Sequence, residues 1–208
     1  MRRVREGLLM RLFAALLPPE HVLAELVRPV RELQRLPGAE RLRWTPRAGR
    51  HCTLAFYGEV SEEQCERLVG RLARAAGRSE PQRLRIAGGG RFGDQVLWAA
   101  VRAVPEESDA GVRRLAWASA AAGRRAGVTV PEGRGFTAHL TLARARGRAG
   151  AVRLAPFVER LDAVAGTPWR ADALALVWSK LPVGGVEGEQ PRYETVATWP
   201  LGSGRTRA

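Results

Sequence analysis

The sequence predicts an α+β protein of two comparable lobes, and three observations support this fold class. Strand-like and helix-like segments alternate along the chain. Each half carries one copy of the same short motif, "HCTLAF" at 51–56 and "HLTLAR" at 139–144. No linker rich in proline, serine and glycine separates the halves, so we expect one folded domain over residues 10–201, with an extension at 1–9 and a tail at 202–208.

The first expected element is a short buried strand in "MRLFAALL", which Pro18 and Pro19 stop. Apolar residues at helical spacing then predict a helix over 20–36, which Pro29 should kink or break. Apolar and alternating runs predict strands at 42–44, 51–57, 82–88, 95–103, 139–144, 171–180 and 192–199. Further helices are expected at 61–76, opened by the capping box "SEEQ", at 108–126 with Ser108 as its cap, and at 157–165.

Glycines mark the ends of several of these elements. Gly58 is expected to end the strand 51–57, and Gly77 and Gly127 to end the two longer helices. The run "GGGRFGD" lacks the Gly-Lys-Ser/Thr ending of a phosphate-binding loop and lies between two strands. It therefore predicts a turn at 88–93.

The charge of the chain is strongly one-sided. A net charge of +13 indicates a polyanionic partner such as RNA, DNA or another phosphate-bearing ligand. Lys180 is the only lysine, so nearly all of this charge is arginine, in a chain also rich in alanine and glycine. A biased genome composition is therefore an alternative source of the same charge.

Cysteine use and hydropathy favour a cytoplasmic protein without a membrane partner. Cys52 and Cys65 form no CxxC pattern and fit a reducing compartment. No apolar run reaches the ~20 residues of a spanning helix. The N-terminal stretch has the basic head of a signal peptide, but Arg11 interrupts its apolar part and no cleavage site follows. Met10 is an alternative initiator to Met1.

The two motif copies indicate the chemistry. Side chains alternate along a strand, so His51 and Thr53 share one face, as do His139 and Thr141, about 6.6 to 6.8 Å apart along each strand. If the lobes face each other, these four side chains meet in one cleft. Hydroxyls donate hydrogen bonds to phosphate oxygens, a neutral histidine can take a proton from water, and a protonated one can give a proton to an alkoxide. The set suits metal-independent cleavage of a strained cyclic phosphodiester.

Two half-buried strands that each carry a surface histidine are the plain alternative. The chain has three histidines, and two of them fall in the frame His-x-Thr-Leu. In a random order this has a probability of about one in ten thousand, so the pair favours a functional site where either copy alone would not. No Asp, Glu or Cys lies at ligand spacing from these histidines, so neither a metal nor another cofactor is expected.

The same residues carry a family resemblance. "HCTLAFYG" and "HLTLAR" resemble the two motifs of the 2H phosphoesterase superfamily, and the chain is most similar within it to the RNA 2′,3′-cyclic phosphodiesterases, also called 2′-5′ RNA ligases. "MRLFAALLPPE", "VLWAAV", "RGFTAHLTLAR" and "RYETVATWPL" extend the similarity over residues 10–201. The resemblance implies two pseudo-symmetric lobes, each with an antiparallel sheet and helices, around a central cleft.

The resemblance also implies roles for individual residues. His51 is expected to donate a proton to the leaving 3′-oxygen and His139 to activate water, which opens a terminal 2′,3′-cyclic phosphate to a 2′-phosphate. Thr53 and Thr141 are expected to hold the phosphate.

Two further substrate contacts are expected, Arg144 and Tyr193. By resemblance, Arg144 adds charge near the phosphate or braces the end of its strand, although strict alternation puts it on the face of Leu140 and Leu142. Tyr193 is expected on the substrate side by resemblance alone.

Three positions depart from the family pattern, namely Arg50, Tyr57 and Ala138. None is a motif histidine or threonine, so the expected activity stands, and Arg50 is a candidate for added RNA binding. The arginines of "RARGRAG" are expected either to meet RNA backbone or to form a solvated loop.

Other aromatic residues and the third histidine have weaker signals. Trp44 and Trp169 are candidates for stacking in the cleft, whereas Trp98 and Trp178 lie within strand patterns that predict core. His21 lies near the start of a helix and is expected on the surface.

Alternative functions stay open at this point. The same cleft could act on 2′-5′-linked oligonucleotides or small cyclic nucleotide phosphates, or run the reverse ligation. A protein of another class, a basic module that binds RNA ends without turnover, is the further alternative. We expect a monomer whose partners are RNA 3′ ends or small cyclic nucleotide phosphates.

Overall fold

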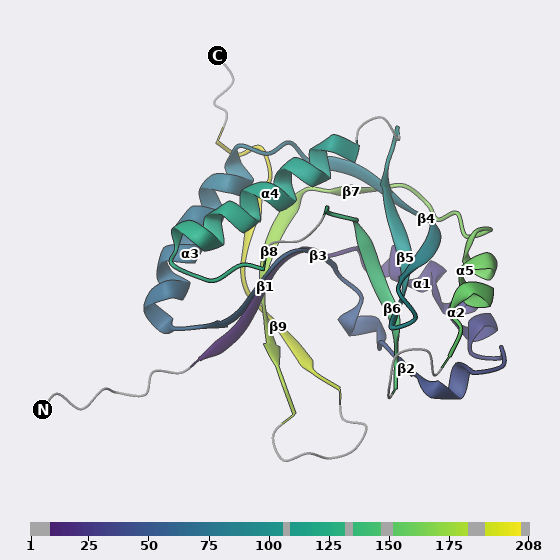
Figure 1. Cartoon of the computed structure of the whole chain (residues 1–208). Helices are drawn as coiled ribbons and strands as arrows, with labels where there is room; N and C mark the ends of the chain where they lie inside the picture. The colour runs from purple at the N-terminus through teal and green to yellow at the C-terminus, as the bar shows by residue number, and fades with distance from the viewer. Residues whose placement is uncertain (1–8, 106–108, 132–134, 147–151, 183–189, 205–208) are drawn as a thin grey trace, which may run out of the picture.

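A curved antiparallel sheet with helices along its outer side forms the protein (Figure 1). The computed structural model describes residues 9–105, 109–131, 135–146, 152–182 and 190–204. The strands are β1 (Met10–Leu16), β2 (Leu42–Trp44), β3 (Cys52–Val60), β4 (Gln82–Phe92), β5 (Val96–Ala103), β6 (His139–Ala145), β7 (Trp169–Ala171), β8 (Ala173–Lys180) and β9 (Arg192–Pro200). The helices are α1 (Glu20–Glu25), α2 (Val27–Leu33), α3 (Glu62–Gly77), α4 (Ala110–Arg125) and α5 (Ala155–Leu161), with 3₁₀ turns at Ala39–Arg41 and Arg47–Gly49.

The strand order divides the sheet into two lobes. It runs β7-β4-β5-β6-β3-β1-β8-β9, and β2 pairs with the end of β6. The lobes meet where β3 lies beside β6, with Cys52 opposite Leu140 as their one register pair. Helices α3 and α4 cover the lobe of β1, β3, β8 and β9, while α1, α2 and α5 lie beside the other lobe (Figure 1). The predicted bilobal α+β fold is confirmed.

Alternation along β1 directs its side chains to two different surroundings. Leu12 and Leu16 are buried in the main core, which also contains the apolar faces of α3 and α4. Phe13 faces the opposite side and forms a small separate cluster with Val177 of β8, against which Tyr193 of β9 packs. This opposite side of the lobe is the surface on which the candidate site is built.

Two local predictions, one from proline and one from serine, are confirmed. The stretch 20–36 forms two helices that break at Leu26, because Pro29 has no N–H for the Glu25 carbonyl and its ring would collide with that carbonyl. The capping box at the start of α3 is present. Ser61 Oγ accepts a hydrogen bond from the Gln64 N–H (3.3 Å), and Gln64 Oε1 accepts one from the Ser61 N–H (3.0 Å).

Two predictions from glycine are wrong. Gly58, with a φ of 66°, lies at a β-bulge opposite Leu12, and β3 continues to Val60. Strand β4 runs through the glycine run to Phe92 and pairs there with β5. A Cβ on Gly90 would collide with the Trp98 ring, so this position requires glycine. Gly90 makes room for a tryptophan ring, and the chain turns only after Phe92.

Other boundaries differ by a few residues. Asp172 separates β7 from β8, which the sequence predicts as one strand, and α5 ends earlier than expected, at Leu161. Ser108, the expected cap of α4, lies outside the described residues. Near the C-terminus, the Gly204 N–H donates to the Gly77 carbonyl (3.0 Å) and holds this part of the chain against the end of α3. No helix within the described ranges is long and apolar enough to cross a membrane.

Candidate active site

The repeated motif begins the two strands at which the lobes meet. His51 directly precedes β3, and His139 is the first residue of β6. The strands pair antiparallel at the residue that follows each histidine, so the register directs His51 toward Thr141 and Thr53 toward His139. The structure thus brings the four predicted motif side chains together.

Each motif copy also contains a β-bulge at its Leu-Ala pair. The register with the neighbouring strand skips Leu142 in β6 and Leu54 in β3. One extra residue reverses the alternation of the residues that follow it. Arg144 and Phe56, each five residues after its histidine, therefore return to the face of the histidines.

Because of this bulge, the expectation that Arg144 faces away from the histidines is wrong. Arg144 lines the same cleft as His51 and Thr53, whereas Leu142 beside it is fully buried. The positive charge of Arg144 lowers the pKa of both motif histidines. The second motif thus delivers a guanidinium as well as an imidazole and a hydroxyl.

His51 lies between two aromatic rings of the first lobe. Its ring stacks on Phe13 with centroids 4.4 Å apart, and the edge of Tyr193 approaches it with centroids 5.0 Å apart. Burial, together with the charges of His139 and Arg144, lowers the pKa of His51 from its usual 6.5 to about 4. Without a bound anion, His51 is therefore neutral at pH 7.

His139 occupies a similar aromatic position in the second lobe. Phe92 and Trp98 lie beside its ring, with centroids 5.0 and 5.8 Å away. Its Nδ1 lies 2.8 Å from the Thr137 carbonyl oxygen, which can only accept, so the proton is on Nδ1 and Nε2 carries the free lone pair. Burial lowers the pKa of His139 most, the hydrogen bond to Thr137 raises it, and the charge of Arg144 lowers it further. This neutral tautomer can accept a proton at Nε2.

A cleft of about 370 Å³ opens beside His51. Three arginines line it, Arg11 from β1, Arg43 from β2 and Arg144 from β6, and the described residues contribute no carboxylate to its walls. Hydroxyl groups of Thr45, Thr53 and Ser179 also line it. A cavity with several cations, hydroxyls and no acid is suited to an anionic ligand.

His139 and Thr141 lie just beyond the residues that line this cavity, on the far side of the contact between β3 and β6. The register places the two motifs side by side, and the charge of His139 also lowers the pKa of His51. The predicted set is therefore brought together, with Thr53 at the cavity and Thr141 next to it.

Tyr193 lies at the cleft, as the resemblance implies. Its ring lies edge-on to that of Phe13, with centroids 5.9 Å apart, and also edge-on to the imidazole of His51. Burial raises the pKa of the Tyr193 phenol, while the charges of Arg144, Arg43 and Arg11 act in the opposite direction. The phenol is therefore a neutral donor within reach of the same charges that surround the cavity.

Sequence reasoning missed Arg11, Arg43 and Phe13. The Arg11 guanidinium carbon lies 4.8 Å from the centroid of the Phe56 ring, which is the counterpart of Arg144 in the first motif. Arg11 and Phe13 are two residues apart on β1, and an arginine in phase with an aromatic residue in an apolar strand is a signal that the sequence does contain. Arg43 has no comparable signal, because only its pairing with Arg144 places it at the cleft.

The tryptophan predictions are largely reversed. Trp169 is 4% exposed and belongs to the core, and Trp44 packs against the core with its Nε1 donating to the Ala39 carbonyl (3.2 Å). Trp98, predicted as core, is instead next to His139. Trp178 packs against the core as predicted, and Lys180 lies over its outer face.

The remaining positions lie away from the cleft or in the core. His21 is exposed on α1 as expected. Arg50 is only 8% exposed, so its proposed contact with RNA is wrong, and burial lowers its pKa. Tyr57 is buried and donates its hydroxyl to the Ser119 carbonyl (3.0 Å), which ties β3 to α4. Ala138 packs against the core.

Part of the "RARGRAG" run falls outside the described residues, which stop at Arg146 and resume at Val152. Within the described residues, no three side chains of His, Cys, Asp or Glu lie close enough together to hold a metal ion.

The comparisons with known proteins agree with this architecture. LigT of Escherichia coli, solved with 3′-AMP, superposes with a TM-score of 0.70 at 23% identity and covers 93% of this chain and 99% of its own. The protein TT0787 of Thermus thermophilus superposes with a TM-score of 0.69 at 27% identity, covering 93% of this chain and 98% of its own. No curated protein sequence matches the chain.

The fold is that of a 2H phosphoesterase. A family model described as the 2′-5′ RNA ligase superfamily matches residues 18–181, which include both motifs. The chain belongs to the 2′-5′ RNA ligase superfamily.

Proposed function

We propose that this protein hydrolyses a terminal 2′,3′-cyclic phosphate of RNA to a 2′-phosphomonoester, without a metal. The observation that carries the proposal is the pair of motif histidines, one directly before β3 and one at the start of β6, next to a cleft. Among the described residues, three arginines and no carboxylate line this cleft. The imidazoles are the groups that can move protons near pH 7, and the arginines favour an anionic substrate.

The reaction assigns one proton transfer to each histidine. His139 Nε2 takes a proton from water as the water oxygen forms a bond to phosphorus. The bond between phosphorus and the 3′-oxygen breaks, and His51 gives its proton to that oxygen. Arg144 and the hydroxyls of Thr53 and Thr141 stabilise the negative charge on the non-bridging oxygens. General acid and base steps each contribute roughly 10²–10⁴-fold.

This assignment requires the substrate to change the charge of His51. In the ligand-free protein the pKa of His51 is about 4, so the imidazole lacks the proton that it must donate. A phosphate anion next to the ring favours the charged imidazolium and raises this pKa. The cyclic phosphate therefore promotes the protonation of its own general acid.

A nucleotide substrate is supported by the relatives, since E. coli LigT has been solved with 3′-AMP and with NADP⁺. Among the aromatic rings beside the histidines, Tyr193 lines the cleft and Phe92 is 42% exposed, so these two rings can pack on a nucleoside. Ligation that forms a 2′-5′ linkage is the same displacement with a 5′-hydroxyl in place of water: the 5′-oxygen bonds to phosphorus, the 3′-oxygen leaves with a proton, and the same two histidines are needed. Cleavage of a 2′-5′ linkage to the cyclic phosphate is the reverse of that step.

The test uses a short RNA that ends in a 2′,3′-cyclic phosphate, with His51→Ala, His139→Ala and His21→Ala compared under identical conditions. The exposed His21 is the matched control, because its removal deletes an imidazole outside the cleft. We expect the two motif variants to lose at least about 10²-fold in turnover and the control to keep it. Full turnover in either motif variant would refute the proposal.

A further inference from the structure

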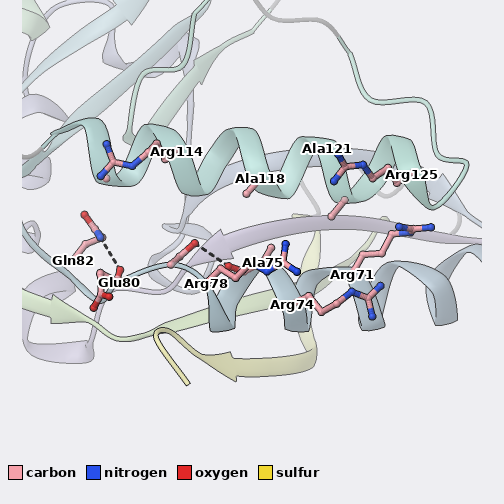
Figure 2. Close-up of a pocket in the computed structure, with 13 residues that line it drawn as sticks. Arg71, Arg74, Ala75, Arg78, Glu80, Gln82, Arg114, Ala118, Ala121 and Arg125 are labelled. Atoms are coloured by element: carbon pink, nitrogen blue, oxygen red, sulfur yellow. Dashed lines mark hydrogen bonds between the residues drawn. The ribbon is translucent and has the colours of Figure 1, made fainter. Parts of the chain in front are cut away.

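A second positively charged cavity, of about 440 Å³, lies between α3 and α4 (Figure 2). Five arginines line it. Arg71 and Arg74 belong to α3, Arg78 is its C-cap, and Arg114 and Arg125 belong to α4. We call this cavity the arginine groove. It lies on the helical side of the first lobe, whereas the catalytic cleft opens on the other side of the same sheet.

The helical repeat explains how the groove is formed. Arg71, Arg74 and Arg78 are spaced by three and four residues and share one face of α3 and its C-cap. On α4, Arg114 and Arg125 flank a stretch with Ala118 and Ala121 on the same face (Figure 2). The small alanine side chains leave the space between the two rows of guanidinium groups open.

Within the described residues, the positive charge that lines the groove exceeds the negative charge. Glu80 is the one acidic residue among those that line it. In the described part of the chain, none of the five arginines forms an ion pair with a carboxylate. Five like charges at close quarters attract a polyanion strongly.

The dimensions indicate an extended ligand with several negative charges. Arg114 and Arg125 are eleven residues apart, which corresponds to about 16 Å along α4 at 1.5 Å per residue. A single phosphate contacts only one part of such a row, whereas a phosphodiester backbone can contact successive guanidiniums.

An exposed tryptophan on the same helix favours a nucleic acid. Trp117 is 59% exposed and lies on α4 about one helical turn from Arg114 and from Ala121, outside the residues that line the groove but on the neighbouring surface of the helix. Exposed aromatic rings beside arginines are typical of proteins that bind single strands, in which bases stack on the rings. A purely acidic peptide gives this tryptophan no role.

We propose that the arginine groove binds single-stranded RNA, with the five arginines on the phosphates and Trp117 stacked on a base. The site is separate from the catalytic cleft and does not depend on the reaction proposed for it. It would hold RNA by its backbone irrespective of sequence and of the chemistry of its 3′ end.

The experiment measures binding of the full-length protein to a labelled single-stranded RNA of about twelve nucleotides that ends in a 3′-hydroxyl. The groove variant combines Arg74→Gln, Arg114→Gln and Arg125→Gln. Its matched control combines Arg31→Gln, Arg35→Gln and Arg153→Gln. These substitutions change three exposed arginines beside the other lobe and remove the same net charge. Melting temperatures check that both proteins are folded.

We expect the groove variant to bind more weakly and with a smaller salt dependence. Between about 50 and 200 mM salt, the slope of log K against log salt should fall by about two, since each lost phosphate contact to a single strand removes about 0.7. The control should keep the slope of the wild type. If the two triple variants lose equal affinity and equal salt slope, the proposed site is wrong, because the net charge of the protein would then explain the binding.

Trp117→Ala tests the RNA assignment separately. We expect affinity to fall about fivefold or more with the salt slope unchanged, and Trp117→Phe to restore most of it. Full affinity in Trp117→Ala would overturn the RNA assignment in favour of a general polyanion site. Turnover of a dinucleotide with a 2′,3′-cyclic phosphate should be the same in the groove variant and the wild type, whatever that turnover is.

Discussion

Protonation of His51 should make the protein lose stability as the pH falls from 6.5 toward 4, and His51→Gln should remove this loss. The unfolded chain binds a proton at His51 with a pKa near 6.5, whereas burial beside Phe13 and Tyr193, together with the charges of His139 and Arg144, lowers the folded pKa to about 4. The unfolded state therefore binds more protons between these two values, so the stability that the neutral ring provides is present above pH 6.5 and lost as the pH falls through 4.

The size of the effect follows from the shift. One pKa unit corresponds to about 1.4 kcal/mol, and the linkage for pKa values of 6.5 and about 4 gives about 2 to 3 kcal/mol between pH 7.5 and 4.5. Carboxylates also titrate in this range, but they are common to both proteins and cancel in the comparison.

The assay is urea unfolding of the wild type, His51→Gln and His21→Gln at pH 7.5 and 4.5. The free energy of unfolding of the wild type should fall by about 2 to 3 kcal/mol more than that of His51→Gln. His21→Gln, which changes an exposed histidine, should follow the wild type. If His51→Gln loses as much stability as the wild type, the ring is not held neutral by its surroundings and the reasoning fails.

Three further predictions concern the cleft and its support. The value of kcat/KM should be greatest below pH 6.5, because it reports the free enzyme, in which the pKa values of His51 and His139 are both lowered; a maximum at pH 7.5 or above would contradict this. Arg144→Gln should lower kcat about 10²-fold and move the kcat/KM profile to higher pH, since the charge that lowers both pKa values is gone; an unchanged profile would remove Arg144 from the site. Tyr57→Phe should lower the free energy of unfolding by about 1 kcal/mol through the lost hydrogen bond to the Ser119 carbonyl, with kcat unchanged, and urea unfolding that matches the wild type would contradict it.

The sequence predicts the parts of the fold that depend on local patterns. The capping box at Ser61 and the helix break before Pro29 are local devices, and both are present. The placement of the motif histidines on facing strands is also predictable, because two equal motifs in two halves imply equivalent positions. The sequence pattern does not specify the register between neighbouring strands.

The wrong predictions concern positions that depend on contacts with neighbouring strands, which the period-two alternation of a single strand does not describe. The bulge at Leu142 changes the face of Arg144, and it is defined by the register with β5 rather than by any residue of the motif. The glycines before Gly93 resemble a turn, but they lie in β4, where Gly90 accommodates the Trp98 ring. Trp98 itself reaches His139 from a strand whose sequence is typical of core, so its role depends on which strand lies next to it.

The most direct test of the proposed function is the product that the wild-type protein forms, in excess EDTA, from an RNA that ends in a 2′,3′-cyclic phosphate. Two histidines that act on water and on the 3′-oxygen predict complete conversion to the 2′-phosphomonoester, with one oxygen from ¹⁸O-labelled water in the phosphate. A 3′-phosphomonoester would contradict the assignment of His51 to the leaving 3′-oxygen. Recovery of the cyclic phosphate intact, with the RNA still bound, would contradict hydrolysis altogether.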